Sequence, residues 1–357
     1  MEHDSTVKVS IVSETLDNYA SGKIDGLQKL QRLGADVPPY ITIGAELSEP
    51  EISALFERLD SNKNNLWAVR SSANVEDGFV SSFAGIFESV IGITGDEIRD
   101  AIQVVRQSAK SEIALAYCRE KGIDPDQISM NVIIQEFKEP LLSGVWMGRD
   151  DGGGRLEWLS GRGDQLVGGL ETPHWLEYDS NYVSMPVGDN DQDEMIDQHG
   201  IRVVEYCRKF TEALCYPLDL EFCITKEGLK WLQLRPITKS IDIASGSLSE
   251  ISIDTNNLFG QSVSSVNAEG IAHRFDQQEG DGWTRGLILL AKQTTPSMMR
   301  YVMTSNGVLA EVGGALSHAA VVCRELGKAC IVGVDISLIP HNAEVKISGS
   351  DGKVTIT

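Results

Sequence analysis

Residues 313–327 read GGALSHAAVVCRELG, and they place one histidine, His318, between a glycine loop and an apolar run of helical composition. Ser317 is a preferred N-cap residue, so the spacing predicts a helix that begins at His318. The free N–H groups and the positive end of such a helix favour an anion held on the imidazole. A neutral histidine nitrogen is a nucleophile at physiological pH, so the stretch indicates a phosphoryl-carrying histidine. A histidine at a helix start can also serve only in capping or packing.

The composition of the chain limits the classes of partner. The 357 residues suffice for two or three domains. The net charge is −21, with 52 acidic and 31 basic residues, so we expect no nucleic-acid partner and no anionic membrane surface. The start of the chain lacks the features of a signal peptide, and no apolar run approaches the roughly 18 residues of a membrane span, so we expect a cytoplasmic protein. The six cysteines form no CxxC pair, which indicates reduced, mostly buried thiols.

The chain divides at a polar, Ser-rich passage near residues 239–257. We therefore expect a first domain over residues 1–240, a linker over 241–258 and a second domain over 259–357. Residues 96–121 show helical spacing that Gly122 ends, and the apolar positions on its one face are Ile98, Ile102, Val105, Ala109, Ile113 and Ala116. Strands are expected at 131–135, 144–147 and 229–234. The alternation of strands and helices predicts a mixed α+β or α/β multidomain fold.

The stretch around His318, together with the strand expected at 329–333, resembles the mobile phosphohistidine domain of the phosphoenolpyruvate-utilising enzymes. That family includes pyruvate phosphate dikinase, phosphoenolpyruvate synthase and rifampin phosphotransferase. The resemblance implies a swivelling β/β/α domain over 259–357 in which His318 is catalytic. It also implies that the loop around the histidine is supported by Gly313, Gly314, Ser317 and Arg324.

Two motifs in the first domain resemble the ATP-grasp-like nucleotide domain of the same family. One is Ser21-Gly22-Lys23, and the other is WAVRSSANVED at 67–77 with SSFAG at 81–85. The resemblance implies that Lys23 and Arg70 bind the phosphates of ATP, which suits the planar fork of an arginine. Two alternatives stay open: a solvated Lys23, and an Arg70 that pairs with Glu76 or Asp77.

Further motifs of the first domain follow in family order. IQEF at 134–137 and SGV at 143–145 are similar to the strands beside the adenine, which implies ATP-binding roles for Gln135, Glu136 and Val145. The loop at 161–169 is similar to a glycine loop of the family. There, Asp164 stands in place of glutamate and Arg162 in place of leucine.

PLDLEF at 217–222 and LQLRPIT at 232–238 are similar to the last two strands of the nucleotide domain. Period-two spacing puts Asp219 with Glu221 on one strand face, and Gln233 with Arg235 on another. The resemblance implies that Glu221 and Gln233 bind Mg²⁺ through oxygen and that Arg235 binds ATP phosphates. A surface ion pair between Glu221 and Arg235 is the alternative.

The resemblance implies an ATP-dependent phosphotransferase of the dikinase type, with ATP and Mg²⁺ as cofactors. His318 would attack the β-phosphorus of ATP and release AMP, and the phosphoryl group would then pass to an acceptor. The motifs include no pyruvate-binding barrel, so we expect a different small-molecule acceptor. One alternative is a split enzyme or relay whose acceptor site lies on a separate protein subunit. Another is a nucleotide-binding regulator without catalysis.

Overall fold

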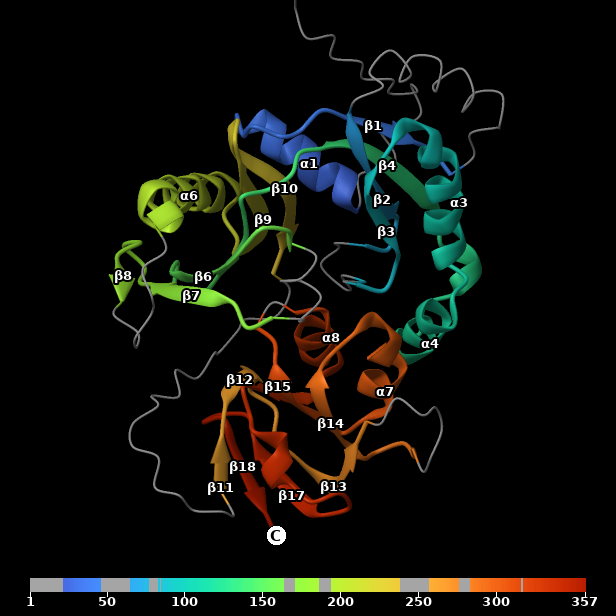
Figure 1. The fold of residues 1–357 in the computed structure, drawn as a ribbon, viewed down its shortest axis with the longest axis vertical. Helices are drawn as coiled ribbons and strands as arrows, with labels where there is room; N and C mark the ends of the chain where they lie inside the picture. The colour runs from blue at the N-terminus through green and yellow to red at the C-terminus, as the bar shows by residue number, and fades with distance from the viewer. Residues whose placement is uncertain are drawn as a thin grey trace, which may run out of the picture.

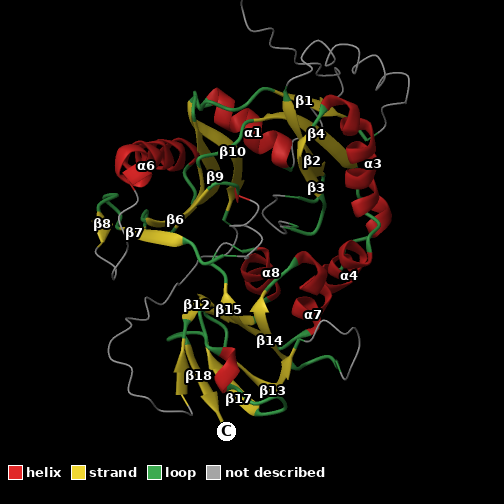
Figure 2. Cartoon of the chain, in the orientation of Figure 1, coloured by secondary structure: helices red, strands yellow, loops and turns green. Residues whose placement is uncertain are grey.

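The computed structural model describes residues 22–45, 65–76, 83, 85–163, 171–185, 194–237, 257–275, 283–315 and 317–357. Within these ranges the chain forms two lobes, the N-terminal lobe (22–237) and the C-terminal lobe (257–357), which lie one above the other in Figure 1. Both lobes combine helices with sheets (Figure 2), as the expected mixed fold requires. The expected linker at 241–258 lies outside the described residues except for its last two positions, as do Ser21, Asp77 and Asp164.

The N-terminal lobe contains a four-stranded and a six-stranded sheet with helices packed against them. The first sheet has the strand order β1-β4-β2-β3, and the second has the order β10-β9-β5-β6-β7-β8. All the pairs in these two sheets are antiparallel. The strands are β1 (Tyr40–Ile43), β2 (Leu66–Ala73), β3 (Ser89–Ile93), β4 (Met130–Phe137), β5 (Leu142–Gly148), β6 (Gly154–Ser160), β7 (His174–Tyr178), β8 (Ser184–Met185), β9 (Leu218–Thr225) and β10 (Gly228–Pro236).

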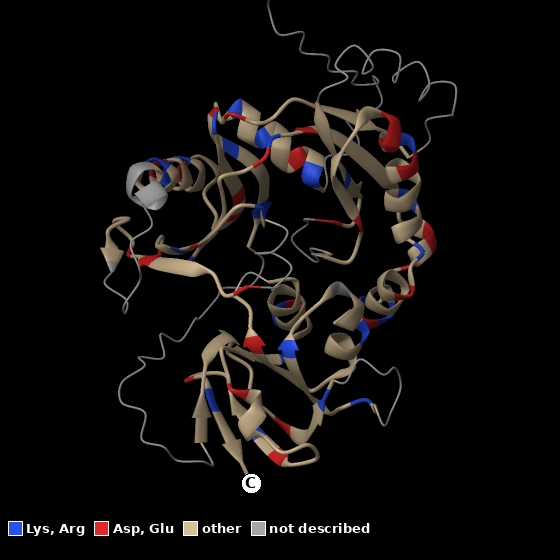
Figure 3. Cartoon of the chain, in the orientation of Figure 1, with Lys and Arg blue, Asp and Glu red and all other residues tan. Residues whose placement is uncertain are grey.

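Four helices of this lobe are described: α1 (Lys23–Arg32), α3 (Ile98–Ser108), α4 (Glu112–Lys121) and α6 (Glu194–Leu214). Helix α1 packs against β10, α3 covers β2 and β4, and α6 packs against β9 and β5. Basic and acidic positions are interspersed along α3 and α4 (Figure 3). The expected strands are confirmed as β4, β5 and β10.

The single helix expected over 96–121 is wrong, because the structure contains two helices there. The side chain of Ser108 donates to the carbonyl of Val105 at 2.6 Å, and Ser111 caps α4 by accepting from the N–H of Ala114 at 3.2 Å. Serine side chains that bond to nearby backbone favour helix ends over helix interiors, which explains the break. The stop at Gly122 is confirmed, since this residue has the left-handed φ of 67°.

The C-terminal lobe is one sheet in the order β11-β18-β17-β13-β14-β15-β16-β12, in which β13, β14, β15 and β16 are parallel. Its strands are β11 (Asn257–Phe259), β12 (Gln261–Ser264), β13 (Ala268–Arg274), β14 (Ile288–Gln293), β15 (Gly307–Val312), β16 (Ala329–Val332), β17 (Glu344–Ser348) and β18 (Lys353–Ile356). Its helices are α7 (Met299–Thr304) and α8 (His318–Leu326). The expected helix start at His318 and the strand after it are confirmed.

One apolar cluster contains buried residues of both lobes. Buried Phe83, Tyr117 and Cys118 of the N-terminal lobe belong to the same cluster as Met299 and Val322 of the C-terminal lobe. Helix α4 packs against α7, and α8 lies at the top of the C-terminal lobe, facing the N-terminal lobe (Figure 1). The structure therefore shows the lobes in a docked arrangement.

Two expectations from composition can be compared with the fold. All six cysteines are free, and all but Cys215 are buried, as expected. Among the described helices, none has both the length and the apolar composition needed to cross a membrane.

Candidate functional site

His318 lies where the two lobes meet. It is the first residue of α8, and Ser317 caps the helix by accepting from the N–H of Ala320 at 3.3 Å. A Cβ atom built on Gly85 of the N-terminal lobe would fall 2.2 Å from Cγ of His318 and 2.5 Å from its Nδ1. The imidazole therefore rests directly on the Gly85 backbone, in the second half of the motif at 81–85.

The surroundings keep His318 neutral. Part of the side chain is accessible to solvent, but Nδ1 is buried and has no hydrogen-bond partner among the described residues. Burial, followed by the positive charges of Arg235 and Lys23, lowers the pKa of His318 to about 4. At neutral pH the ring thus carries an unprotonated nitrogen close to two cations, a combination suited to nucleophilic attack on an anion.

Lys23 belongs to a polar network at the start of α1. Its Nζ donates to Oγ of Ser71 at 2.9 Å and forms an ion pair with Glu76. Glu76 is almost completely buried and also accepts from Ser71 at 2.9 Å and from the N–H of Ala73 at 2.6 Å. The side chain of Lys23 is 15% exposed, so the solvated alternative is not what the structure contains. Because Glu76 pairs with Lys23, the structure does not show the alternative Arg70–Glu76 pair.

Arg70 connects three strands of the N-terminal lobe. Its guanidinium donates to Oε1 of Gln135 at 3.3 Å, to Oε1 of Gln233 at 2.8 Å and to the carbonyl of Leu232 at 2.7 Å. It also lies 3.5 Å from Oε2 of Glu221. Four of the residues selected from sequence motifs therefore converge: Arg70, Gln135, Glu221 and Gln233.

Arg235 forms a buried ion pair with Asp219. Two nitrogens of Arg235 lie 2.7 Å from Oδ2 of Asp219, and both side chains are buried. Strand register explains the pairing, because Arg235 lies opposite Asp219 while Gln233 lies opposite Glu221. Burial raises the pKa of Asp219, although Arg235 acts in the opposite direction. Arg235 is buried, so it is not the surface residue that the alternative pairing with Glu221 assumed.

Of the other residues expected beside the adenine, Glu136 lies apart from this group, whereas Val145 lies directly opposite Glu221 across β5 and β9. Gln135 and Glu136 are neighbours on β4, so their side chains point to opposite faces. Gln135 also donates to the carbonyl of Pro38 at 3.3 Å, whereas Glu136 pairs with Lys138 at 2.9 Å. Val145 is buried in β5. The side chain of Glu136 therefore points away from the cluster of Arg70, Gln135, Glu221 and Gln233, and only its backbone lies beside Gln135 in β4.

The loop before His318 is bound from both lobes. Arg324 donates to the carbonyls of Ala315 and, at 3.3 Å, of Val263, and burial lowers the pKa of its guanidinium. Gly313 has a φ of 146°, which favours glycine. A Cβ atom on Gly314 would fall 2.7 Å from Oε2 of Glu157, so only a glycine fits beside that carboxylate.

Sequence reasoning missed three residues of this arrangement. Glu76 was considered only as a partner of Arg70, and Asp219 only as a neighbour of Glu221 on one strand face. Both stand inside motifs, so their patterns could have identified them. Glu157 lies in a strand without a motif, and no sequence signal indicated its contact with the loop before His318.

The residues expected to bind a metal supply two oxygens from directly paired positions, since Glu221 and Gln233 face each other across β9 and β10. Carboxylate and amide oxygens suit Mg²⁺, which commonly takes its other ligands from phosphates and water. Among the described residues no group of three or more His, Cys, Asp or Glu side chains forms a metal cage. The donor set therefore fits a metal held jointly with a phosphate ligand.

Two protein-family models match the chain. The model described as pyruvate phosphate dikinase, AMP/ATP-binding domain, matches residues 10–181, and the one described as PEP-utilising enzyme, mobile domain, matches residues 283–352. The first match contains Lys23, Arg70 and Gln135, and the second contains His318.

Several curated proteins are similar along much of the chain. The probable phosphoenolpyruvate synthase of Methanothermobacter thermautotrophicus is 26% identical over 96% of this chain and 55% of its own length. The phosphoenolpyruvate synthase of Pyrococcus furiosus is 26% identical over 84% of this chain and 41% of its own. The rifampicin phosphotransferase of Streptomyces sviceus is 27% identical over 50% of this chain and 24% of its own. The chain spans about half the length of the first of these relatives and less of the others.

Proposed function

Since this chain belongs to the phosphoenolpyruvate-utilising enzyme family, we propose that it is an ATP-dependent phosphotransferase of the dikinase type. His318 takes the β-phosphoryl group of ATP, AMP leaves, and the phosphohistidine passes its phosphoryl group to a small-molecule acceptor. The observation that carries the proposal is the contact of His318, from the C-terminal lobe, with Gly85 of the lobe that matches an AMP/ATP-binding domain. The lowered pKa of His318 agrees with it.

The first step forms a bond between a ring nitrogen of His318 and the β-phosphorus, and it breaks the bond from that phosphorus to the oxygen that leaves with AMP. The γ-phosphate is then released to water or inorganic phosphate. Lys23, Arg70 and Arg235 hold the triphosphate and offset its charge, which is mainly positional and electrostatic catalysis. Mg²⁺, bound by Glu221 and Gln233, would neutralise further phosphate charge.

Several contacts of these cations are with protein groups that a nucleotide can replace or share. Arg70 donates to the Oε1 atoms of Gln135 and Gln233, which are neutral acceptors that compete weakly with phosphate for a guanidinium. Arg235, in contrast, is fixed by a buried carboxylate. The site thus combines Arg70, whose shortest side-chain contacts are with neutral amides and which lies 3.5 Å from Glu221, with Arg235, whose direction is set by Asp219.

ATP labelled separately in its β- and γ-phosphates tests this function. The proposal predicts that label from the β-phosphate stays on the protein, that AMP forms in equal amount, and that both are lost in His318→Ala. Retention of γ-label with formation of ADP would indicate ordinary kinase chemistry and contradict the dikinase step. Turnover that requires a second protein after normal charging would replace the small-molecule acceptor with a partner subunit.

A further inference from the structure

We propose that Glu157 is a positioning residue that holds the loop of residues 313–315 against the N-terminal lobe and so places His318 for reaction. The proposal rests on the function proposed above. Glu157 lies in β6 of the N-terminal lobe, yet its Oε1 accepts the N–H of Ala315, three residues before His318, at 3.2 Å. This hydrogen bond links the strand directly to the loop that carries the nucleophile.

The carboxylate is completely buried. Its Oε1 also accepts from Nε of Arg155 at 2.7 Å. Its Oε2 has no hydrogen-bond partner among the described residues and lies where a side chain on Gly314 would stand. Burying a carboxylate with one oxygen unpaired among the described residues is costly, and simple packing gives no return for that cost.

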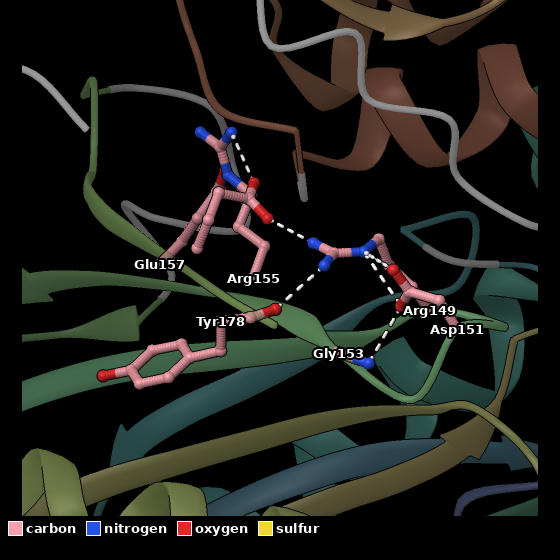
Figure 4. Close-up of polar contacts among 7 residues, drawn as sticks. Arg149, Asp151, Gly153, Arg155, Glu157 and Tyr178 are labelled. Atoms are coloured by element: carbon pink, nitrogen blue, oxygen red, sulfur yellow. Dashed lines mark hydrogen bonds and ion pairs between the residues drawn. The ribbon is translucent and has the colours of Figure 1, made fainter. Parts of the chain in front are cut away.

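Arg155, held by its own neighbours, keeps the carboxylate of Glu157 in place. Figure 4 shows Arg155 and Glu157 together on their strand, with Arg149 turned toward the backbone of Tyr178. Arg155 lies 3.5 Å from Glu177, its guanidinium stacks 4.0 Å from the ring of Trp175, and Arg149 also pairs with Glu177. Side chains locked by such a network hold a supported group more accurately than mobile ones.

The backbone of Ala315 is therefore hydrogen-bonded by one residue from each lobe. Its N–H is bound by Glu157 of the N-terminal lobe, and its carbonyl is bound by Arg324 of the C-terminal lobe. Because a misplacement of about 1 Å can cost about 100-fold in rate, this clamp would affect the reaction without touching ATP.

The chain offers a matched control in Glu177. It is also a buried carboxylate paired with Arg155, but it lies one strand further along, on β7. Its described partners, Arg149 and Arg155, both belong to the N-terminal lobe. Loss of Glu177 therefore disturbs the same ionic network and leaves the bond to Ala315 in place.

The experiment compares Glu157→Ala, Glu157→Gln and Glu177→Ala in the full chain, measuring the Kd for ATP, the rate of phosphoenzyme formation at saturating ATP, and hydrogen exchange of the peptide that contains Ala315. In Glu157→Ala we expect charging to fall about 10- to 100-fold with an unchanged Kd, and the Ala315 amide to exchange faster. Glu157→Gln should retain most of the rate, because an amide oxygen can still accept from Ala315 and Arg155. Glu177→Ala weakens the network around Arg155 but keeps both hydrogen bonds to Oε1 of Glu157, so it should slow charging and expose Ala315 much less than Glu157→Ala does.

Charging of a folded Glu157→Ala at the wild-type rate would overturn the proposal. If that variant does not fold, Gly314→Ala decides, because the added methyl group would meet Oε2 of Glu157 and Cγ of Pro173, each at 2.7 Å, and would push the loop away from the N-terminal lobe. Slower charging together with faster exchange at Ala315 supports the proposal, and an unchanged rate overturns it. If the wild-type chain forms no phosphoenzyme, the proposed function fails, and hydrogen exchange alone decides. Faster exchange at Ala315 in Glu157→Ala than in Glu177→Ala then supports the clamp, and equal exchange overturns it.

Discussion

The imidazole of His318 lies on the backbone of Gly85, so close that a Cβ atom on Gly85 would fall 2.2 Å from Cγ of the histidine. These two residues come from different lobes and from two motifs that are more than 200 residues apart in the sequence. The contact fixes the docked position of the imidazole at the lobe that matches the AMP/ATP-binding domain.

Gly85→Ala should prevent His318 from docking. Phosphoenzyme formation at saturating ATP is expected to fall about 100-fold, because the methyl group occupies the position of the ring. Gly122→Ala is the matched control, since Gly122 has the same φ of 67° and an added Cβ atom there meets nothing within 4 Å. Rapid-quench measurement of charging in both variants gives the comparison. Equal rates in the two would show that His318 reacts from another position.

The charging rate should depend weakly on pH around neutrality. Burial and the charges of Arg235 and Lys23 lower the pKa of His318 from 6.5 to about 4, so the ring stays neutral and nucleophilic well below pH 6. The rate, measured with ATP binding checked at each pH, should be flat from about pH 8 to pH 5, where an ordinary histidine of pKa about 6.5 would already be protonated. A fall in rate centred near pH 6.5 would contradict this account of the site.

The same shift affects stability. Between pH 6.5 and about 4 the unfolded chain binds a proton on His318 that the folded chain does not bind, so stability decreases as the pH falls through this window. Denaturant titrations should show a weaker loss in His318→Ala over the same range. A loss of equal size in both proteins would place the proton uptake elsewhere.

Lys23 should contribute to the affinity for ATP. A lysine that binds a phosphate through a charged hydrogen bond contributes about 1.5–3 kcal/mol, so Lys23→Met is expected to raise the Kd for ATP about 10- to 100-fold. Lys29→Met is the control, because Lys29 lies on the same helix but contacts Asp25 at 2.7 Å and the hydroxyl of Tyr216 at 3.5 Å, neither of which is an expected ATP-binding residue. Calorimetric titration with ATP distinguishes the two, and similar affinities would remove Lys23 from the nucleotide site.

The pair of Tyr117 and Glu325 should stabilise the docked arrangement. Tyr117 of α4 donates to Glu325 of α8 across the lobes, and burial raises the pKa of its hydroxyl. Tyr117→Phe keeps the packing against Phe83 and removes a hydrogen bond that contributes about 1–3 kcal/mol. Small-angle scattering should then show a larger fraction of extended molecules. A scattering curve identical to that of the wild type would mean that apolar contacts alone hold the lobes together.

Much of the site followed from local patterns in the sequence. Period-two spacing put Gln233 and Arg235 on a common strand face, and the N-cap at Ser317 predicted the start of α8. Both results depend on neighbours along the chain. The same alternation along β4 directs the side chain of Glu136 away from that of Gln135.

The contacts between lobes could not be predicted in this way. Glu157 and Ala315 are 158 residues apart, and Tyr117 and Glu325 are 208 apart, so no periodicity connects them. The partner of Arg235 depended on strand register, which puts Asp219 opposite it and Glu221 opposite Gln233. Strand register and lobe docking arise from tertiary packing, and the alternation of side chains along a single strand does not encode them.

The most direct test of the central claim is the intact mass of the purified chain after incubation with Mg²⁺-ATP, beside His318→Ala treated in the same way. The account predicts a phosphate or pyrophosphate adduct on the wild-type protein and none on the variant. An adduct that persists in His318→Ala would contradict the assignment of His318 as the phosphoryl carrier.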